Sequence, residues 1–246
     1  MAAGGMAAGG KAQRGGKPRP AKGGAARKPA SKPAPKRPAK PAPAPEPALT
    51  GTFRLGAIPG ATPGKWIDTW KQRMPLAPLD LVPLEMATQR DALVAGEVDA
   101  AIVRLPLDRD GLHAIPLYEE VTVVICSVDS HLTAADELTD ADLAGEVRIV
   151  PLDDVLDLEI AGTEAPRFAA PATTADAVAT VASGVGIVVV PMSLARLHHR
   201  KDVEYRPLVG APASAVALAW PVDGQTPLVD AFIGIVRGRT ANSSRA

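Results

Sequence analysis

Cysteine, aromatic residues and long apolar runs are all scarce in this sequence of 246 residues. The single cysteine, Cys126, cannot form an intramolecular disulfide, and because it lies in an apolar run we expect a buried free thiol and a reducing compartment. No stretch approaches the roughly 18 uninterrupted apolar residues of a membrane span. Residues 1–10 lack the charged segment of a secretory signal. We therefore expect a soluble cytoplasmic protein.

Net charge is absent from the chain as a whole, but charges of the two signs are separated along it. Residues 1–50 hold eleven of the 27 Lys and Arg and one of the 27 Asp and Glu, so they carry +10 and the rest of the chain −10. They also hold 10 of the 25 prolines and no aromatic residue. A basic segment joined to an acidic body suggests a polyanionic partner for the basic segment.

Residues 1–51 are predicted to be a disordered basic tail rich in Lys, Pro and Ala. Nothing in them can be buried to offset the entropy of ordering the backbone, and frequent prolines favour extended conformations. Clustered cations bind nucleic-acid phosphates nonspecifically because they release counterions; the alternative is a solubilising spacer without a dedicated partner. Nonspecific nucleic-acid contact is predicted for Lys17, Arg19, Lys28, Lys32, Lys36, Arg37 and Lys40.

The body that follows alternates strand-like and helix-like segments. Strands are predicted at 53–58, 79–85 and 100–104, with helices at 65–74 and 88–96 between them. This alternation predicts an α/β fold, and the third strand is apolar enough to be buried on both faces. Further strands are predicted at 112–118, 120–126, 147–150, 187–190, 203–208 and 215–220, and further helices at 173–183, 191–199 and 227–238.

Three segments in this order resemble the effector-binding domain of LysR-type transcriptional regulators. They are LVAGEVDAAIVRLP at 93–106, GLHAIPLYEEVTVVI at 111–125 and VASGVGIVVVP at 181–191. The resemblance covers residues 52–240.

The resemblance implies a two-lobed fold of the type 2 periplasmic-binding-protein kind, with a ligand cleft between the lobes. Lobe I would comprise 52–126 and 208–240, lobe II 127–207, and residues 241–246 would be a disordered C-terminus. Such regulators begin with a winged helix-turn-helix domain, and here the basic tail stands in its place. The resemblance therefore matches the sensor half alone, and sequence-specific DNA binding is not carried over.

Motifs for catalysis, metal binding and phosphate binding are not found. Residues 60–65 fail as a P-loop, because Pro59 occupies the position of the first glycine and Trp66 that of the required Ser or Thr. The four histidines lack metal-ligand spacing, and there is no Gly-x-Ser-x-Gly nucleophile elbow. We expect neither an enzyme nor a bound metal or cofactor.

A recognition site is what remains, and its ligand contacts are predicted from both lobes. The loop 58–64 leads to a helix N-terminus that can bind a carboxylate, and the resemblance implies that it lines the cleft. Arg104 ends a buried strand, where α/β proteins place ligands, and its cation suits an anion; the equal alternative is a surface Arg paired with Asp108 or Glu119. The predicted ligand-binding residues are Ile58, Pro59, Gly60, Thr62, Arg104, Thr173, Thr174 and Gly184.

Two pairs of interpretations stay open. Thr173 and Thr174 either cap a helix or, as the resemblance implies, present hydroxyls to the ligand; capping explains one of them well, so we expect one to contact ligand. Trp66, Ile67 and Trp70 form an apolar helix face, which either packs into the core or makes a dimer contact. The family pairs this helix with lobe II of a second subunit, and Trp is enriched at interface hot spots, so a homodimer is predicted.

The sequence thus predicts a LysR-type effector-binding domain involved in transcriptional regulation. It would bind a small anionic metabolite, in particular a carboxylate, between its lobes, while the tail makes nonspecific contacts with DNA. One alternative is a stand-alone solute-binding protein or enzyme of the same fold. The other is a nucleoid-associated protein that acts through the tail.

Overall fold

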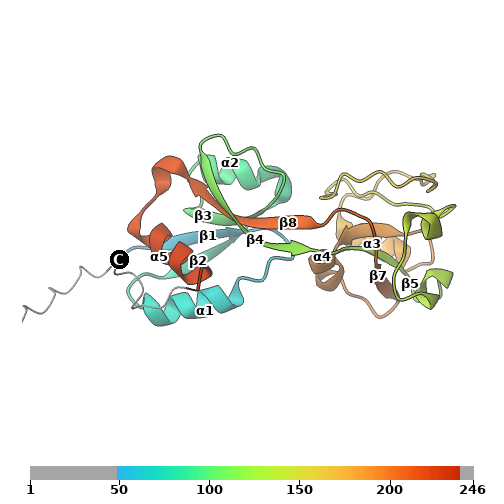
Figure 1. Cartoon of the computed structure of the whole chain (residues 1–246), viewed down its shortest axis with the longest axis horizontal. Coiled ribbons are helices and arrows are strands. Elements are labelled where there is room, and N and C mark those ends of the chain that lie inside the picture. The colour runs from blue at the N-terminus through green and yellow to red at the C-terminus, as the bar shows by residue number, and fades with distance from the viewer. Residues whose placement is uncertain (1–48, 239–246) are drawn as a thin grey trace, which may run out of the picture. The chain divides into compact units, whose positions relative to one another are not determined.

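The computed structural model describes residues 49–238, so nearly all of the predicted tail, the seven cations predicted to contact nucleic acid and residues 239–246 lie outside the described part. Within it the chain builds two α/β lobes, each around its own sheet (Figure 1). We call residues 49–120 together with 214–238 the first lobe, and residues 122–208 the second lobe. No helix of this part of the chain is long and apolar enough to cross a membrane.

The first lobe contains a five-stranded mixed sheet in the order β2-β1-β3-β8-β4. β1 pairs in parallel with β2 and β3, whereas β8 is antiparallel to both β3 and β4. The central strand β3 is buried at every residue, as its apolar sequence predicts. The strands are β1 (Phe53–Ala57), β2 (Leu79–Pro83), β3 (Ala100–Arg104), β4 (Leu112–Glu120) and β8 (Ser214–Pro221).

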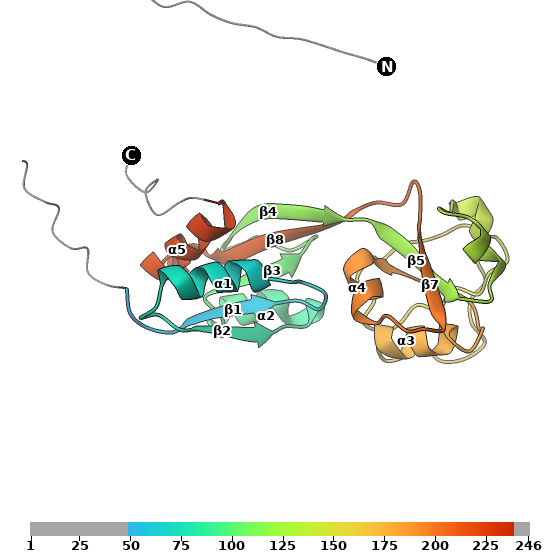
Figure 2. The same cartoon turned by 90° about the horizontal axis from the view of Figure 1, so that it is seen from below.

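Helices cover both faces of this sheet, because side chains along each strand point alternately to the two sides. One face packs against α1 (Gly64–Arg73) and α5 (Pro227–Val236), which lie side by side (Figure 2). The other face packs against α2 (Gln89–Val94). The lobe also contains two 3-10 helices, η1 (Met86–Thr88) and η4 (Val222–Gly224).

Aromatic side chains dominate the core under α1 and α5. The Phe53 ring stacks on Trp70, with 4.7 Å between centroids, and lies 5.1 Å from the Phe232 ring. Trp220 of β8 belongs to the same cluster. Such pairs contribute roughly 0.5–1.5 kcal/mol each beyond the area they bury, so this cluster fixes α1 and α5 to the sheet.

The second lobe is built on a three-stranded antiparallel sheet in the order β6-β5-β7. Thr173 caps α3 by accepting a hydrogen bond from the Asp176 amide, and Gly184, at φ +85°, follows its end. The elements are β5 (Thr122–Ser127), η2 (His131–Ala134), η3 (Asp140–Leu143), α3 (Thr174–Val181), β6 (Val188–Pro191), α4 (Met192–Leu197) and β7 (Val203–Pro207). The predicted strand at 147–150 is reduced to isolated bridges, from Val147 to Glu164 and from Arg148 to Ile187.

The chain passes between the lobes twice, at Val121 and between Leu208 and Ser214. The first passage lies before Thr122 and not after residue 126, because β5 pairs with β6 and β7 in the second sheet. The predicted boundary is misplaced since 112–127 forms an almost continuous extended run, in which only the pairing partners change. Cys126 is a free thiol that is fully buried in β5, as predicted, and burial raises the pKa of this thiol.

Candidate functional site

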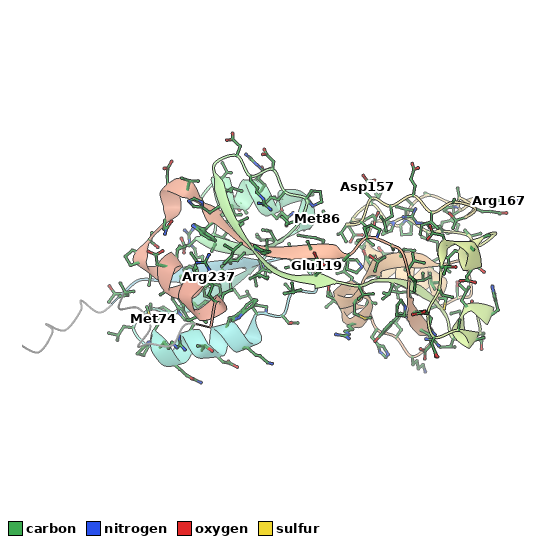
Figure 3. The ribbon with its side chains drawn as sticks, in the orientation of Figure 1. Met74, Met86, Glu119, Asp157, Arg167 and Arg237 are labelled. Carbon is green, nitrogen blue, oxygen red and sulfur yellow. The ribbon has the colours of Figure 1, made fainter. Side chains whose placement is uncertain are left out.

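A pocket of about 620 Å³ opens where the two lobes meet. Its wall in the first lobe consists of the loop 60–62 and the end of β4 with the passage residue, 118–121. Its wall in the second lobe comes from α4, through Met192, Ser193, Arg196 and Leu197. Figure 3 shows Glu119, one of the lining residues, where β4 runs toward the second lobe.

The loop after β1 approaches α4 closely because Gly60 has no side chain. Gly60 has φ +83°, which disfavours other residues, and a Cβ atom built there would lie 2.5 Å from Ser193 Oγ. Glycine is thus required both by the backbone and by the neighbouring lobe. This contact sets how near the two walls of the pocket come at its inner edge.

The N-terminus of α1 faces this loop without a neutralising group from the described residues. Its N-cap position, Pro63, makes no side-chain hydrogen bond, and its first turn contains no acidic residue. Thr62, just before it, is exposed and lines the pocket. The partial positive charge of a helix N-terminus is therefore open to an anion here.

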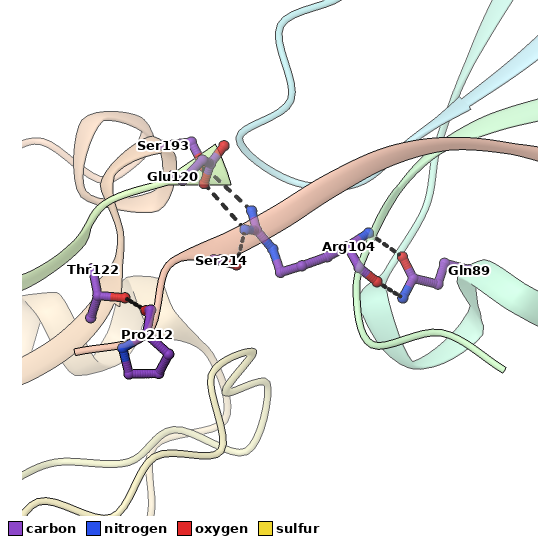
Figure 4. A network of polar contacts seen from close by, with 7 residues as sticks. All are labelled: Gln89, Arg104, Glu120, Thr122, Ser193, Pro212 and Ser214. Carbon is purple, nitrogen blue, oxygen red and sulfur yellow. Dashed lines mark hydrogen bonds and ion pairs between the residues drawn. The ribbon is translucent and has the colours of Figure 1, made fainter. Parts of the chain in front are cut away.

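Arg104 lies behind the pocket in a buried polar network that joins the lobes (Figure 4). Its side chain is 2% exposed, and its Nη1 donates to Glu120 Oε2 at 3.2 Å and to Ser214 Oγ at 2.5 Å. Ser193 Oγ, from α4 of the second lobe, donates to the same Glu120 oxygen at 2.7 Å. The Gln89 side chain pairs with both backbone groups of Arg104, at 2.9 and 3.0 Å. Arg104 is therefore fixed by four segments of the chain.

This network changes the expectation for Arg104. The alternative of a surface Arg paired with Asp108 or Glu119 is wrong, because Arg104 is buried and pairs with Glu120, while Asp108 pairs with Arg90 at 3.2 Å. An anion that used Arg104 would have to displace Glu120. Arg104 thus helps to fix the junction of the lobes, and its positive charge is already paired.

The open cation of the pocket wall is Arg196, which is exposed and makes no ion pair with any described residue. Tyr118, near the end of β4, lines the same pocket. Burial, with a smaller contribution from Glu120, raises the pKa of Tyr118, so its phenol stays protonated and can donate a hydrogen bond. The wall combines a guanidinium, a phenol and the Thr62 hydroxyl, a set suited to a small anion.

The structure brings two of the predicted ligand-binding residues of the first lobe, Gly60 and Thr62, into this pocket. Ile58 is buried behind the loop, where its amide donates to Ile102 O, and Pro59 is exposed beside it. Neither of these two lines the pocket.

The predicted contacts from the second lobe do not line the pocket. Thr173 serves as the N-cap of α3, and Thr174 is buried and donates to Asp153 Oδ1 at 2.9 Å. Gly184 follows α3 in the left-handed conformation. Both threonine hydroxyls are thus engaged within their own lobe.

The lining residues of β4 and α4 escaped the sequence reasoning, among them Tyr118, Glu120, Ser193 and Arg196. Ser193 and Glu120 are 73 residues apart and meet only because β5 pairs with β6, which places the start of α4 beside the end of β4. The pairing of β5 with β6 cannot be predicted from the local sequence pattern of either strand. Among residues 49–238, no cluster of three or more His, Cys, Asp and Glu could hold a metal ion.

The predicted dimer residues on α1 divide between core and surface. Trp70 is fully buried, and its Nε1 donates to Ala77 O at 2.7 Å, so its side chain has no surface to offer a second subunit. Trp66 and Ile67 are partly exposed and pack against the edge of the same core. The core interpretation therefore describes Trp70.

Comparison with known proteins gives a consistent set of relatives. Residues 47–241 match the family described as LysR substrate binding domain. The Hca operon transcriptional activator HcaR of Escherichia coli (strain K12) is 27% identical over 202 residues, which cover 76% of this chain and 68% of HcaR. The transcriptional regulator CatR of Pseudomonas putida is 31% identical over 172 residues, which cover 64% of this chain and 58% of CatR. The chain thus spans about three fifths to two thirds of the length of these relatives.

Solved structures show the same fold. The effector-binding domain of BenM with its effector benzoate superposes with a TM-score of 0.63 at 18% identity, covering 76% of this chain and 91% of that one. The oxidised form of OxyR superposes with a TM-score of 0.62 at 20% identity, covering 78% of this chain and 95% of that one. At these identities the likeness concerns the fold.

Proposed function

This chain belongs to the family of LysR substrate-binding domains, and from this membership we propose that it binds a small-molecule effector between its lobes in the service of transcriptional regulation. The observation that carries the proposal is the pocket of about 620 Å³ whose walls come from both lobes. A ligand held by both walls shifts the equilibrium between lobe arrangements by its difference in affinity for them. The relatives HcaR and CatR are named as transcriptional regulators, which supports regulation over catalysis.

We propose that the effector is a small carboxylate. Arg196 supplies the open cation, Thr62 a hydroxyl, and the uncapped N-terminus of α1 a further positive end. The negative charge of Glu120 is already engaged by Arg104, and Glu119 is exposed to water. The BenM domain, of the same fold, was solved with benzoate, itself a carboxylate.

Replacement of the open cation tests this proposal. We expect benzoate or another member of a panel of small carboxylates to stabilise the chain in a thermal-shift assay, whereas the matching amides do not. Arg196→Gln should weaken that binding by about 10-fold or more, because a charge-assisted hydrogen bond is lost. Arg237→Gln, on exposed Arg237 at the end of α5, is the matched control and should bind like the wild type. Hits confined to neutral or cationic compounds, or full binding by Arg196→Gln, would refute the carboxylate.

We further propose that the basic tail contacts nucleic acid and that the chain forms a homodimer in the cytoplasm. Eleven cations against one anion in residues 1–50 support the tail contact. The partly exposed Trp66 and Ile67 support a contact through α1.

A further inference from the structure

A second pocket, of about 460 Å³, lies in the second lobe, and no residue of the first lobe lines it. Its walls include Arg148, Val150 and the segment 163–166, with Phe168 beside them. Arg167, next to Phe168 in the chain, lies at the end of the second lobe away from Glu119 of the first pocket (Figure 3). The two pockets are therefore separate sites.

Arg148 brings an unsatisfied cation to this second pocket. Its Nη1 donates to the Leu158 carbonyl, but its Nε is buried without a hydrogen-bond partner in the described part of the chain. None of the ion pairs among residues 49–238 involves it. A buried donor without an acceptor is costly, so this guanidinium is poised to gain from an incoming anion.

Backbone hydrogen bonds to two neighbouring segments hold the chain at Arg148, so the position of its Cα atom is fixed. The Arg148 amide donates to Glu164 O at 2.8 Å, and the next amide, of Ile149, donates to Ile187 O at 2.9 Å. The Glu164 amide in turn donates to Glu146 O at 2.8 Å. A ligand that pairs with this guanidinium pays less for ordering it than it would on a free loop.

Besides Thr163 and Glu164, the remaining wall is apolar and open to a ligand. Phe168 is 42% exposed and Val150 is 40% exposed, although both are large hydrophobic residues. Pro166 continues this surface. The wall thus combines one cation with an apolar platform, which a ligand with an anionic head and an apolar body would cover.

We propose that the second lobe carries a second small-molecule site, which takes a monocarboxylate with an aromatic or aliphatic body. The planar guanidinium of Arg148 matches a carboxylate, and Phe168 with Val150 receives the body. The exposed carboxylate of Glu164 in the same wall disfavours ligands with two negative charges. The chain would then respond to two ligand concentrations, one at each pocket.

Phenylacetate and its neutral isostere phenylacetamide are suitable probes, used with the full chain. We expect phenylacetate to shift the amide resonances of the non-proline residues in 148–150 and 163–170 in a two-dimensional NMR titration, and phenylacetamide to shift them at least about 10-fold more weakly. Arg148→Gln should lose binding at these resonances by about 10- to 100-fold, and Phe168→Ala should weaken it without removing the charge preference. Should Arg148→Gln not fold, Phe168→Ala and the comparison of the two probes still decide the matter.

The site between the lobes supplies the internal control. Arg196→Gln should leave the phenylacetate response at 148–150 and 163–170 unchanged. The second site is therefore tested independently of the effector pocket. Equal responses to both probes, shifts confined to residues of the first pocket, or an unchanged titration in Arg148→Gln would each overturn the proposal.

Discussion

At the scale of single residues, the ion pair of Arg104 with Glu120 is the contact whose loss should cost the most stability. Both side chains are almost fully buried, at 2% and 8% exposure, so each depends on the other to offset the loss of water. Ser193 adds a hydrogen bond to Glu120 from the second lobe. The intact pair therefore holds the junction of the lobes together. Removal of one partner leaves the other buried without a partner, which destabilises the fold.

We predict that Glu120→Gln and Arg104→Met each lower the free energy of unfolding by about 3 kcal/mol or more, because each leaves a buried polar group without its partner. The double variant should lose clearly less than the sum of the two. Urea denaturation at fixed slope measures these changes. Arg90→Met, in the more exposed pair of Arg90 with Asp108, is the control and should cost about 1 kcal/mol or less. Additive losses in the double variant would show that the two side chains act independently.

The sequence locates part of the candidate site but not its electrostatics. Gly60 and Thr62 follow the first strand directly, so a loop beside the cleft is predictable from local pattern. The partners of Arg104 are not, because Glu120 follows 16 residues later in another strand and Ser214 follows 110 residues later. Whether a cation is free or neutralised depends on such long-range pairings.

At the scale of elements, the predicted and observed bounds agree best where the hydrophobic pattern and the residue that ends the element both lie within or next to the element itself. The strand predicted at 100–104 is β3 without change, and the helix predicted at 65–74 is α1 moved by one residue, since Pro75 limits it. The segment 147–150 has a strand-like sequence but makes only isolated bridges. Its strand character depends on partners that its own residues do not specify.

α1 also allows the core and dimer interpretations to be separated. We predict that Trp70→Asp unfolds the chain, because it places a charge in the aromatic cluster. Ile67→Asp, on a partly exposed residue of the same helix, should yield a folded monomer from a dimer. Sedimentation velocity with circular dichroism distinguishes the two outcomes.

The matched control on this helix is Gln72→Asp, at an exposed position, which should leave both fold and mass unchanged. A wild-type chain that sediments as a monomer at high concentration would contradict the dimer, and so would a dimer that survives Ile67→Asp.

At the scale of the whole molecule, the separation of charge determines which part can meet a polyanion. Residues 1–50 carry +10 and the remainder −10, so the body alone should be repelled by DNA. We predict that removal of residues 1–48 abolishes DNA binding while the thermal unfolding midpoint of the body stays the same. For the full chain, the logarithm of the binding constant should fall with the logarithm of salt concentration by about 0.9 per neutralised phosphate.

Competition between two unrelated duplexes of equal length tests whether this contact reads sequence. Equal competition is the expected result, because phosphate contacts carry no base information. A clear preference for one duplex, or DNA binding retained after removal of residues 1–48, would contradict the nonspecific tail contact.

The placement of the three tryptophans has a spectroscopic consequence. Trp66 and Trp70 lie on α1 and Trp220 lies on β8, so all three belong to the first lobe. Intrinsic tryptophan emission therefore reports on that lobe alone, while the β6-β5-β7 sheet contributes to far-ultraviolet circular dichroism. If the two signals lose their native values at the same urea concentration, the lobes unfold as one cooperative unit. If the tryptophan emission keeps its native value after part of the dichroism is lost, the second lobe unfolds first, and its unfolding leaves the emission unchanged.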